Sequence, residues 1–180
     1  MNDSSPHWPH APVHRFSEQG IYMVTAGIYQ KQFLLNTPEK LTLVRDMLFK
    51  YAMQFEWKLQ AWAIMGNHYH FVAAAPDDPS TLPNFISRLH EYSAKKLNRL
   101  DETPGRKVWH NFWDSCITHQ TSYFARLRYV HHNPVHHGVT ENASNYAWCS
   151  QAWLERTAER SHINTLARFK TDRITVHDDF

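Results

Sequence analysis

This chain of 180 residues has few glycines, few cysteines and little net charge. Five glycines and 42% hydrophobic residues exclude a collagen-like or low-complexity chain and indicate a folded globular domain. The two cysteines, Cys116 and Cys149, lack the spacing of a disulfide framework or a zinc site, so we expect reduced thiols. No apolar run approaches the length that spans a membrane, and the first residues lack a secretory pattern. We therefore expect a cytoplasmic protein with no membrane partner.

The formal net charge of +2 is too small for a strongly basic nucleic-acid binder. Any acidic partner must therefore meet a local patch of positive charge. The densest basic stretch is interrupted by a few acidic residues and comprises Arg88, Lys95, Lys96, Arg99, Arg106 and Lys107. Exposed aromatic side chains such as Trp8 or Trp109 can stack on nucleic-acid bases. A solvated helix face and tryptophans of the core explain the same residues equally well.

Hydrophobic periodicity predicts four strands and three helices. Thr37-Pro38-Glu39 has the pattern of a helix start, and Gly66-Asn67 separates two strand-like runs as a hairpin turn does. Asn133-Pro134 is expected to end the third helix, because proline cannot continue the hydrogen-bond ladder. The predicted strands are residues 21–29, 58–65, 68–75 and 107–118, and the predicted helices are 38–56, 85–101 and 122–132. This order is that of an α+β, ferredoxin-like β-α-β-β-α-β fold with an antiparallel sheet, followed by one further helix.

The stretch GNHYHFV (66–72) places two histidines on one predicted strand. Residues two apart on a strand point to the same face, so His68 and His70 project together while Tyr69 and Phe71 project to the other side. Two imidazoles on one face are suited to bind a divalent metal ion. With 14 histidines in the chain, about one such pair is expected by chance. Taken alone, the pair is explained better by two ordinary polar residues on an open sheet face.

A second candidate group lies on the third predicted helix, in RLRYVHHNPVHHGV (126–139). Tyr129 and Asn133 are four residues apart and therefore share one helical face. The tyrosine is a candidate nucleophile, and the amide oxygen of the asparagine is a candidate metal ligand. Ordinary packing of the tyrosine and a normal helix stop at the asparagine explain the same two residues.

Four blocks, taken together and in this order, resemble a known family. AWAIMGNHYHFV, YSAKKLNR, VWHNFWDS and YVHHNPVHHGV are similar to the REP-associated tyrosine transposases, which are single-tyrosine HUH nucleases related to insertion-sequence transposases. The resemblance covers about Ile21 to Trp153, and NYAWCSQAWL (145–154) resembles the family's downstream block. Gly66 stands where the family commonly has proline, which loosens the hairpin and leaves the histidines intact.

This resemblance implies a site and an activity. His68 and His70 match the metal-binding pair, Asn133 the residue that completes the metal site, and Tyr129 the catalytic tyrosine, with Mg²⁺ or Mn²⁺ as the cofactor. The implied activity is nicking and joining of single-stranded DNA at hairpins, including repetitive palindromic elements of the nucleoid, through a 5′-phosphotyrosine. The enzyme is expected to act as a monomer or a homodimer. We expect a flexible N-terminal arm (1–20), an HUH transposase-like domain (21–155) and a C-terminal tail (156–180).

Two other functions remain open at this stage. The chain can be a hairpin-binding protein that has the fold without the cleavage activity. It can also be a small metallohydrolase with a histidine-rich site, although no further acidic ligand or general base lies near the histidines in the sequence. The intact set of His68, His70, Tyr129 and Asn133 favours the transposase.

Overall fold

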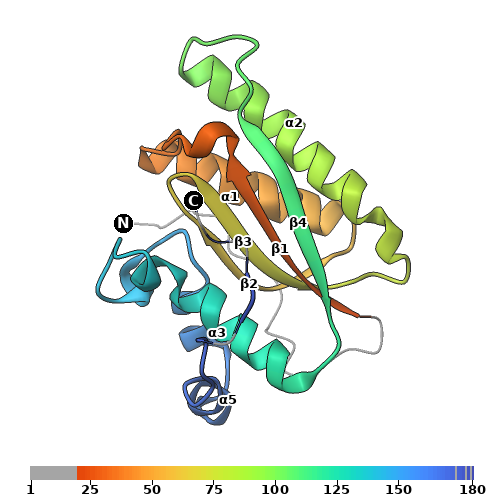
Figure 1. Cartoon of the computed structure of the whole chain (residues 1–180), viewed down its shortest axis with the longest axis vertical. Coiled ribbons are helices and arrows are strands. Elements are labelled where there is room, and N and C mark those ends of the chain that lie inside the picture. The colour runs from red at the N-terminus through yellow and green to blue at the C-terminus, as the bar shows by residue number, and fades with distance from the viewer. Residues whose placement is uncertain (1–19, 173, 177, 179) are drawn as a thin grey trace.

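One antiparallel sheet organises the chain in a computed structural model that describes residues 20–172, 174–176, 178 and 180 (Figure 1). Its strands lie in the order β2-β3-β1-β4, and every neighbouring pair is antiparallel. The strands are β1 (Ile21–Ile28), β2 (Lys58–Ile64), β3 (His68–Ala74) and β4 (Trp109–Ile117). All four predicted strands are therefore present, and β2 and β3 form the expected hairpin.

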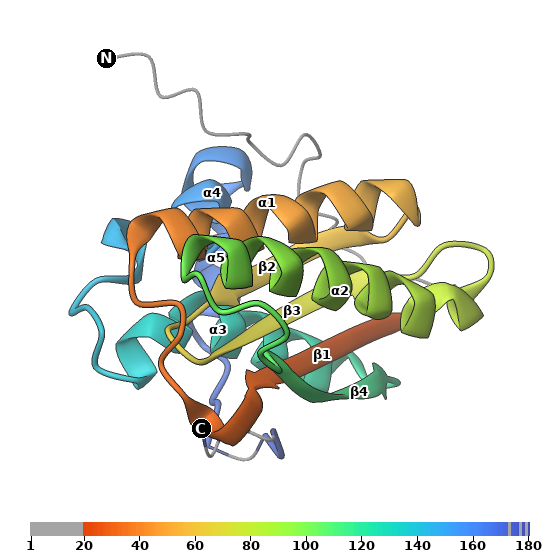
Figure 2. The same cartoon turned by 90° about the horizontal axis from the view of Figure 1, so that it is seen from above.

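Helices cover both faces of the sheet (Figure 2). Helices α1 (Pro38–Gln54) and α2 (Leu82–Leu100) pack side by side on one face, while α3 (Gln120–His136) packs against β2 and β3 on the other. The predicted ferredoxin-like order with one added helix is confirmed. The remaining helical segments are short: η1 (Tyr29–Lys31), η2 (Pro79–Thr81), η3 (Ala143–Asn145), α4 (Gln151–Thr157) and α5 (Arg160–Leu166).

Local sequence explains how the central elements begin and which faces they bury. The Thr37 hydroxyl accepts a hydrogen bond from the Lys40 backbone N–H at the start of α1, with Pro38 in the first turn. Along β3, Tyr69 and Phe71 point to the face under α2, where the Phe71 ring packs 5.6 Å from the ring of Phe85. The two histidines of β3 must then face α3.

Helix α3 continues past the point at which we expected it to end. It begins at Gln120 and ends at His136, with Pro134 inside its last turn. Proline forfeits only the hydrogen bond that its own nitrogen would donate, and the next turn still forms, because the backbone N–H of His137 donates to the carbonyl of Asn133 at 3.0 Å. The prediction that Asn133-Pro134 ends the helix was wrong. Asn133 consequently holds a helical position one turn after Tyr129.

The segment after α3 returns to the sheet and pairs with its edge strand. The Ile64 N–H donates to the carbonyl of Trp148, and the Ser150 N–H donates to the carbonyl of Trp62, both at 2.9 Å. Such pairing covers the backbone groups that an edge strand otherwise exposes. Helix α5 follows within the region predicted as a tail, and its Leu166 is buried.

The predicted flexible arm, residues 1–20, lies outside the described residues except for Gly20. Among the helices of the described part of the chain, none is both long enough and apolar enough to cross a membrane. Gly66 lies at the β2–β3 turn, where the ring of Phe33 comes close. A Cβ at this position would lie 2.9 Å from Cδ1 of Phe33, so a larger residue requires that ring to move.

Candidate active site

The two histidines of β3 lie beneath α3 and are buried. His68 is 2% exposed and His70 is fully buried. The expectation of an open sheet face was wrong, because α3, Asp178 and Phe180 cover this part of the sheet. In the sheet, His68 stands opposite Gly27 of β1 and His70 stands opposite Thr25.

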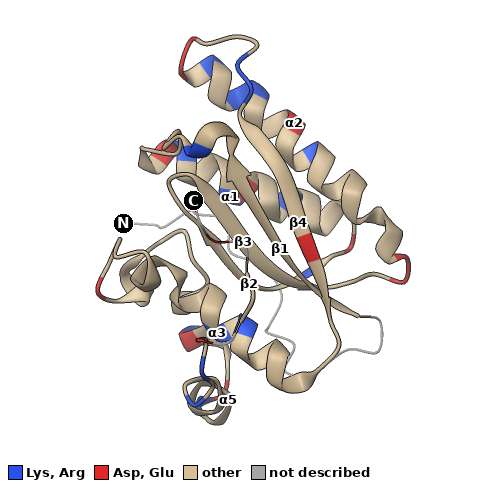
Figure 3. Cartoon of the chain, in the orientation of Figure 1, with Lys and Arg blue, Asp and Glu red and all other residues tan. Residues whose placement is uncertain are grey.

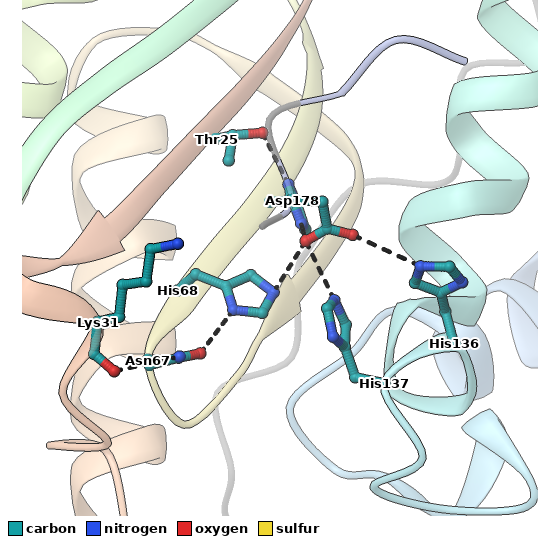
Figure 4. A network of polar contacts seen from close by, with 8 residues as sticks. Thr25, Lys31, Asn67, His68, His136, His137 and Asp178 are labelled. Carbon is teal, nitrogen blue, oxygen red and sulfur yellow. Dashed lines mark hydrogen bonds and ion pairs between the residues drawn. The ribbon is translucent and has the colours of Figure 1, made fainter. Parts of the chain in front are cut away.

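Each of these imidazole rings is held through its Nδ1 atom (Figure 4). His68 Nδ1 lies 2.8 Å from Oδ1 of Asn67, whose Nδ2 in turn donates to the carbonyl of Lys31. His70 Nδ1 lies 2.7 Å from the hydroxyl of Thr25. Both Nε2 atoms consequently face the space under α3. Metal-binding histidines are commonly oriented in this way, with one ring nitrogen hydrogen-bonded and the other free for the ion.

Two residues that the sequence analysis did not select complete a cluster with these Nε2 atoms. Asp178 Oδ1 lies 3.0 Å from Nε2 of both His70 and His137, and 3.4 Å from Nε2 of His68. The ligand atoms of these four residues all lie within 4.8 Å of one another. His137 follows Tyr129 and Asn133 at intervals of four residues, a spacing that marks it in the sequence. No sequence signal connects Asp178 with His70, 108 residues away.

Burial favours the neutral form of these imidazoles. Burial lowers the pKa of His68 to about 3, and the neighbouring His70 lowers it further, while Asp178 acts in the opposite direction. The pKa of His70 is also lowered to about 3, chiefly by burial. Burial and the adjacent His136 lower the pKa of His137. The neutral ring is the form of histidine that binds a metal ion.

Tyr129 and Asn133 project from α3 onto the same face of the sheet. The Tyr129 ring lies edge-on to His70, with centroids 5.6 Å apart, and is 8% exposed. Asn133 is fully buried, and its side chain lies close enough to His68 to raise the pKa of that ring. Among the described residues, neither the Tyr129 hydroxyl nor either amide atom of Asn133 has a hydrogen-bond partner of ordinary geometry. A buried polar group without a partner costs about 1–3 kcal/mol, so each such group calls for a physical explanation.

The donor atoms of this cluster suit a divalent metal ion. Imidazole nitrogens, a carboxylate oxygen and an amide oxygen are all ligands of divalent cations, and two of the imidazoles are already oriented. The unpartnered amide of Asn133 supplies an oxygen that an ion or a phosphate-bound water can satisfy. The described residues therefore fit a bound divalent ion.

The predicted basic residues lie away from this cluster, on and after α2 (Figure 3). Arg88 and Lys95 both pair with Glu91, and Arg106 pairs with Asp101 at 2.7 Å. Lys107 lies over the ring of Tyr29. Lys96 and Arg99 are exposed and make no ion pair with any described residue. These residues thus come from α2 and the segment that follows it, and α2 packs on the face of the sheet opposite the histidines.

Trp109 is not an exposed stacking platform. It is 7% exposed, its ring stacks on His90 with centroids 4.7 Å apart, and its Nε1–H donates to the Ser93 hydroxyl. This prediction was wrong because β4 turns the indole toward α2 and into the core. Trp8, the other candidate, lies outside the described residues.

Comparison with known proteins gives consistent results. The family model "Transposase IS200 like" matches residues 17–133. A REP-associated tyrosine transposase of Escherichia coli K12 is 22% identical over 128 residues, which cover 71% of this chain and 73% of the relative. A solved structure of a REP-associated tyrosine transposase bound to a REP hairpin matches with a TM-score of 0.60 at 19% identity, covering 92% of each chain. A putative transposase from Deinococcus radiodurans matches with a TM-score of 0.46 at 18% identity, covering 62% of this chain and 90% of that one.

Proposed function

Since the chain belongs to the IS200-like transposase family, we propose that it is a metal-dependent enzyme that nicks and joins single-stranded DNA beside hairpins. One observation carries the proposal. Tyr129 is held on α3 against His70, and its hydroxyl has no hydrogen-bond partner among the described residues. A phenol that is positioned beside candidate metal ligands, and whose oxygen is not engaged in a hydrogen bond, is suited to attack a phosphate. The hairpin substrate is suggested by the REP hairpin in the related structure.

In the proposed reaction, Tyr129 Oη attacks phosphorus as the nucleophile. The Oη–P bond forms while the bond from phosphorus to the 3′ oxygen breaks, which leaves a 5′-phosphotyrosine and a 3′-hydroxyl. The proton lost by the phenol ends on that hydroxyl, so the step is balanced without ATP, and reversal rejoins a strand. A phenol with an ordinary pKa of about 10 is mostly protonated at neutral pH, so positioning and activation are needed.

The remaining residues bind and orient in this proposal. His68, His70 and Asn133 would hold a divalent ion such as Mg²⁺ or Mn²⁺, which polarises the phosphate and compensates its charge when bound. Asn67 and Thr25 keep the two imidazole rings in place through Nδ1.

Covalent trapping tests the proposal directly. The purified protein is incubated with a single-stranded DNA that carries a hairpin, labelled on the 3′ side of the expected nick, in the presence of Mn²⁺ or Mg²⁺. We expect a labelled adduct that survives denaturing electrophoresis. The adduct should not form when EDTA is present during the incubation. Hairpin binding without any adduct, across both ions and several hairpins, would contradict cleavage and support the alternative below.

The alternative is a hairpin-binding protein of the same fold without cleavage activity. The observation that favours it is the position of the last residues of the chain. Asp178 contacts His68 and His70, and the ring of Phe180 stacks on His68 with centroids 4.7 Å apart. These side chains lie where a DNA phosphate would have to approach the histidines.

We propose that the basic surface of α2 binds the DNA backbone. Charge reversal at both Lys95 and Lys96 is expected to weaken hairpin binding and to flatten its salt dependence by about one to two units of slope, because each lost phosphate contact removes a released counterion. Fluorescence anisotropy over a range of salt concentrations measures both effects. The matched control reverses the exposed Arg156 of α4 and Arg160 of α5, which changes the net charge equally at a different place on the surface. Equal slopes for the two double variants would show that the DNA does not follow α2.

A further inference from the structure

The Asp178 carboxylate occupies an unusual position for an acidic group near the end of the chain. A single oxygen atom, Oδ1, lies 3.0–3.4 Å from Nε2 of His68, His70 and His137. The side chain of Asp178 is only 11% exposed, and Phe180 stacks on His68 beside it. The contacts thus come from β3, from the residue after α3 and from the C-terminal segment (Figure 4).

The hydrogen bonds of Asn67 determine which nitrogen of His68 carries the proton. Asn67 Nδ2 faces the carbonyl of Lys31, so its Oδ1 must be the atom that meets Nδ1 of His68, and Nδ1 must be the donor. The Nε2 atom of the neutral ring then presents a lone pair toward Asp178 Oδ1 at 3.4 Å. Two electron-rich atoms at this distance repel each other unless a proton or a cation lies between them.

The three separations from Asp178 Oδ1, two of which are also hydrogen-bond distances, match those of atoms that share one cation. Bonds from a divalent ion to imidazole nitrogen or carboxylate oxygen are about 2.0–2.2 Å long. Two ligands at right angles or at a tetrahedral angle are then about 3.0–3.4 Å apart by simple geometry. The three distances from Asp178 Oδ1 fall in this range. The four ligand atoms lie within 4.8 Å of one another, so any pair farther apart than about 4.4 Å must move closer together when an ion binds.

We propose that His137 and Asp178 are ligands of the same divalent ion as His68 and His70, so that ion binding fastens the C-terminal segment to the sheet in the DNA-free protein and a DNA phosphate must displace Asp178 to reach the ion. This deepens the metal site of the proposed function, in which only the histidine pair and Asn133 were assigned, but it does not depend on DNA cleavage. Three imidazoles and one carboxylate form a more nitrogen-rich set than Mg²⁺ prefers. The site should therefore bind Mn²⁺ or Co²⁺ more tightly than Mg²⁺.

Titration calorimetry with each metal ion alone, without DNA, tests this assignment. Relative to the native protein, His137→Ala and Asp178→Asn are each expected to weaken Mn²⁺ binding at least tenfold, with His68→Ala as the reference for a lost ligand. His136→Ala is the matched control, because this neighbouring histidine has a 62% exposed side chain and its Nε2 lies 3.9 Å from the other oxygen of Asp178. It should change the affinity less than about twofold. Circular dichroism without metal checks that each variant is folded.

A second measurement reports on the C-terminal segment itself. Addition of Mn²⁺ should slow amide hydrogen exchange at residues 174–176 in the native protein and should have no such effect in Asp178→Asn. Native Mn²⁺ affinity in both His137→Ala and Asp178→Asn would overturn the proposal, as would the absence of Mn²⁺ and Co²⁺ binding by the native protein. If the native protein binds neither ion, the side chains of the cluster are held together by hydrogen bonds and shared protons and not by a metal ion.

The outcomes for the ligand set and for the proposed function are separate. A native protein that forms the DNA adduct, with variants that bind Mn²⁺ normally, retains the nuclease function and loses this ligand assignment. If the variants bind Mn²⁺ more weakly but the native protein forms no adduct, the ligand assignment is retained and the nuclease function is rejected.

Discussion

Replacing Tyr129 by phenylalanine is expected to abolish the covalent protein–DNA adduct while hairpin binding stays within about twofold of the native value. The substitution removes one oxygen and almost no volume. That oxygen has no hydrogen-bond partner among the described residues, so the free energy of unfolding should remain within about 1 kcal/mol or rise slightly. The measurements are covalent trapping on a denaturing gel, hairpin affinity and chemical denaturation.

The control for this variant is Tyr123→Phe, which also removes one hydroxyl from α3. Tyr123 lies nearly two turns before Tyr129 and is fully buried, so it cannot reach a phosphate at the histidines without unfolding of the helix. This variant should form the adduct at close to the native rate. A persistent adduct in Tyr129→Phe would show that the nucleophile is a different residue.

His70→Ala should lower the rate of adduct formation at least a thousandfold and should also destabilise the protein. The imidazole is fully buried, and its loss leaves a cavity and a Thr25 hydroxyl without its Nδ1 partner. A cost of about 2–4 kcal/mol in the free energy of unfolding is expected from these two effects. The lower rate of adduct formation has a separate cause, because the proposed ion loses one of its ligands. Chemical denaturation and a single-turnover nicking assay measure the two effects.

A second buried histidine, His131, provides a control that distinguishes lost stability from a lost metal ligand. His131 is 1% exposed, and its Nδ1 lies 2.8 Å from the Ser150 hydroxyl, outside the metal cluster. His131→Ala should therefore be destabilised by a similar amount while it keeps Mn²⁺ binding and adduct formation at temperatures where it is folded. Equal loss of adduct in both variants would mean that unfolding, and not a missing ligand, explains the effect at His70.

The sequence alone determined the order of the elements and the faces of the central strand. Alternation along residues 68–75 places the two histidines on one side and the aromatic residues on the other, because successive side chains of a strand point to opposite faces of the sheet. Helical spacing likewise places Tyr129 and Asn133 on one face of α3. These inferences hold because they depend on local geometry, which is the same for any chain with that pattern. The resemblance to the transposase family came from the same short blocks.

Other features needed the tertiary structure, because they depend on which segments pack together. Strand alternation does not say what covers a face, so the burial of His68 and His70 under α3 and the C-terminal segment could not be read from their strand. The length of α3 likewise depended on tertiary structure, since Asn133 and Pro134 are buried in its last turn and the helical hydrogen bond from His137 to Asn133 still forms.

Asp178 shows most clearly what the sequence alone could not determine. Its carboxylate reaches His70 across 108 residues of chain, and an isolated aspartate in a polar segment has no periodicity that connects it with a distant strand. His137 lies between these cases, because its spacing from Tyr129 marks the face it occupies, but only the folded chain brings it to β3. Residues on one element share a face through local geometry, whereas the contacts between elements are decided by the packing of the whole sheet and its helices.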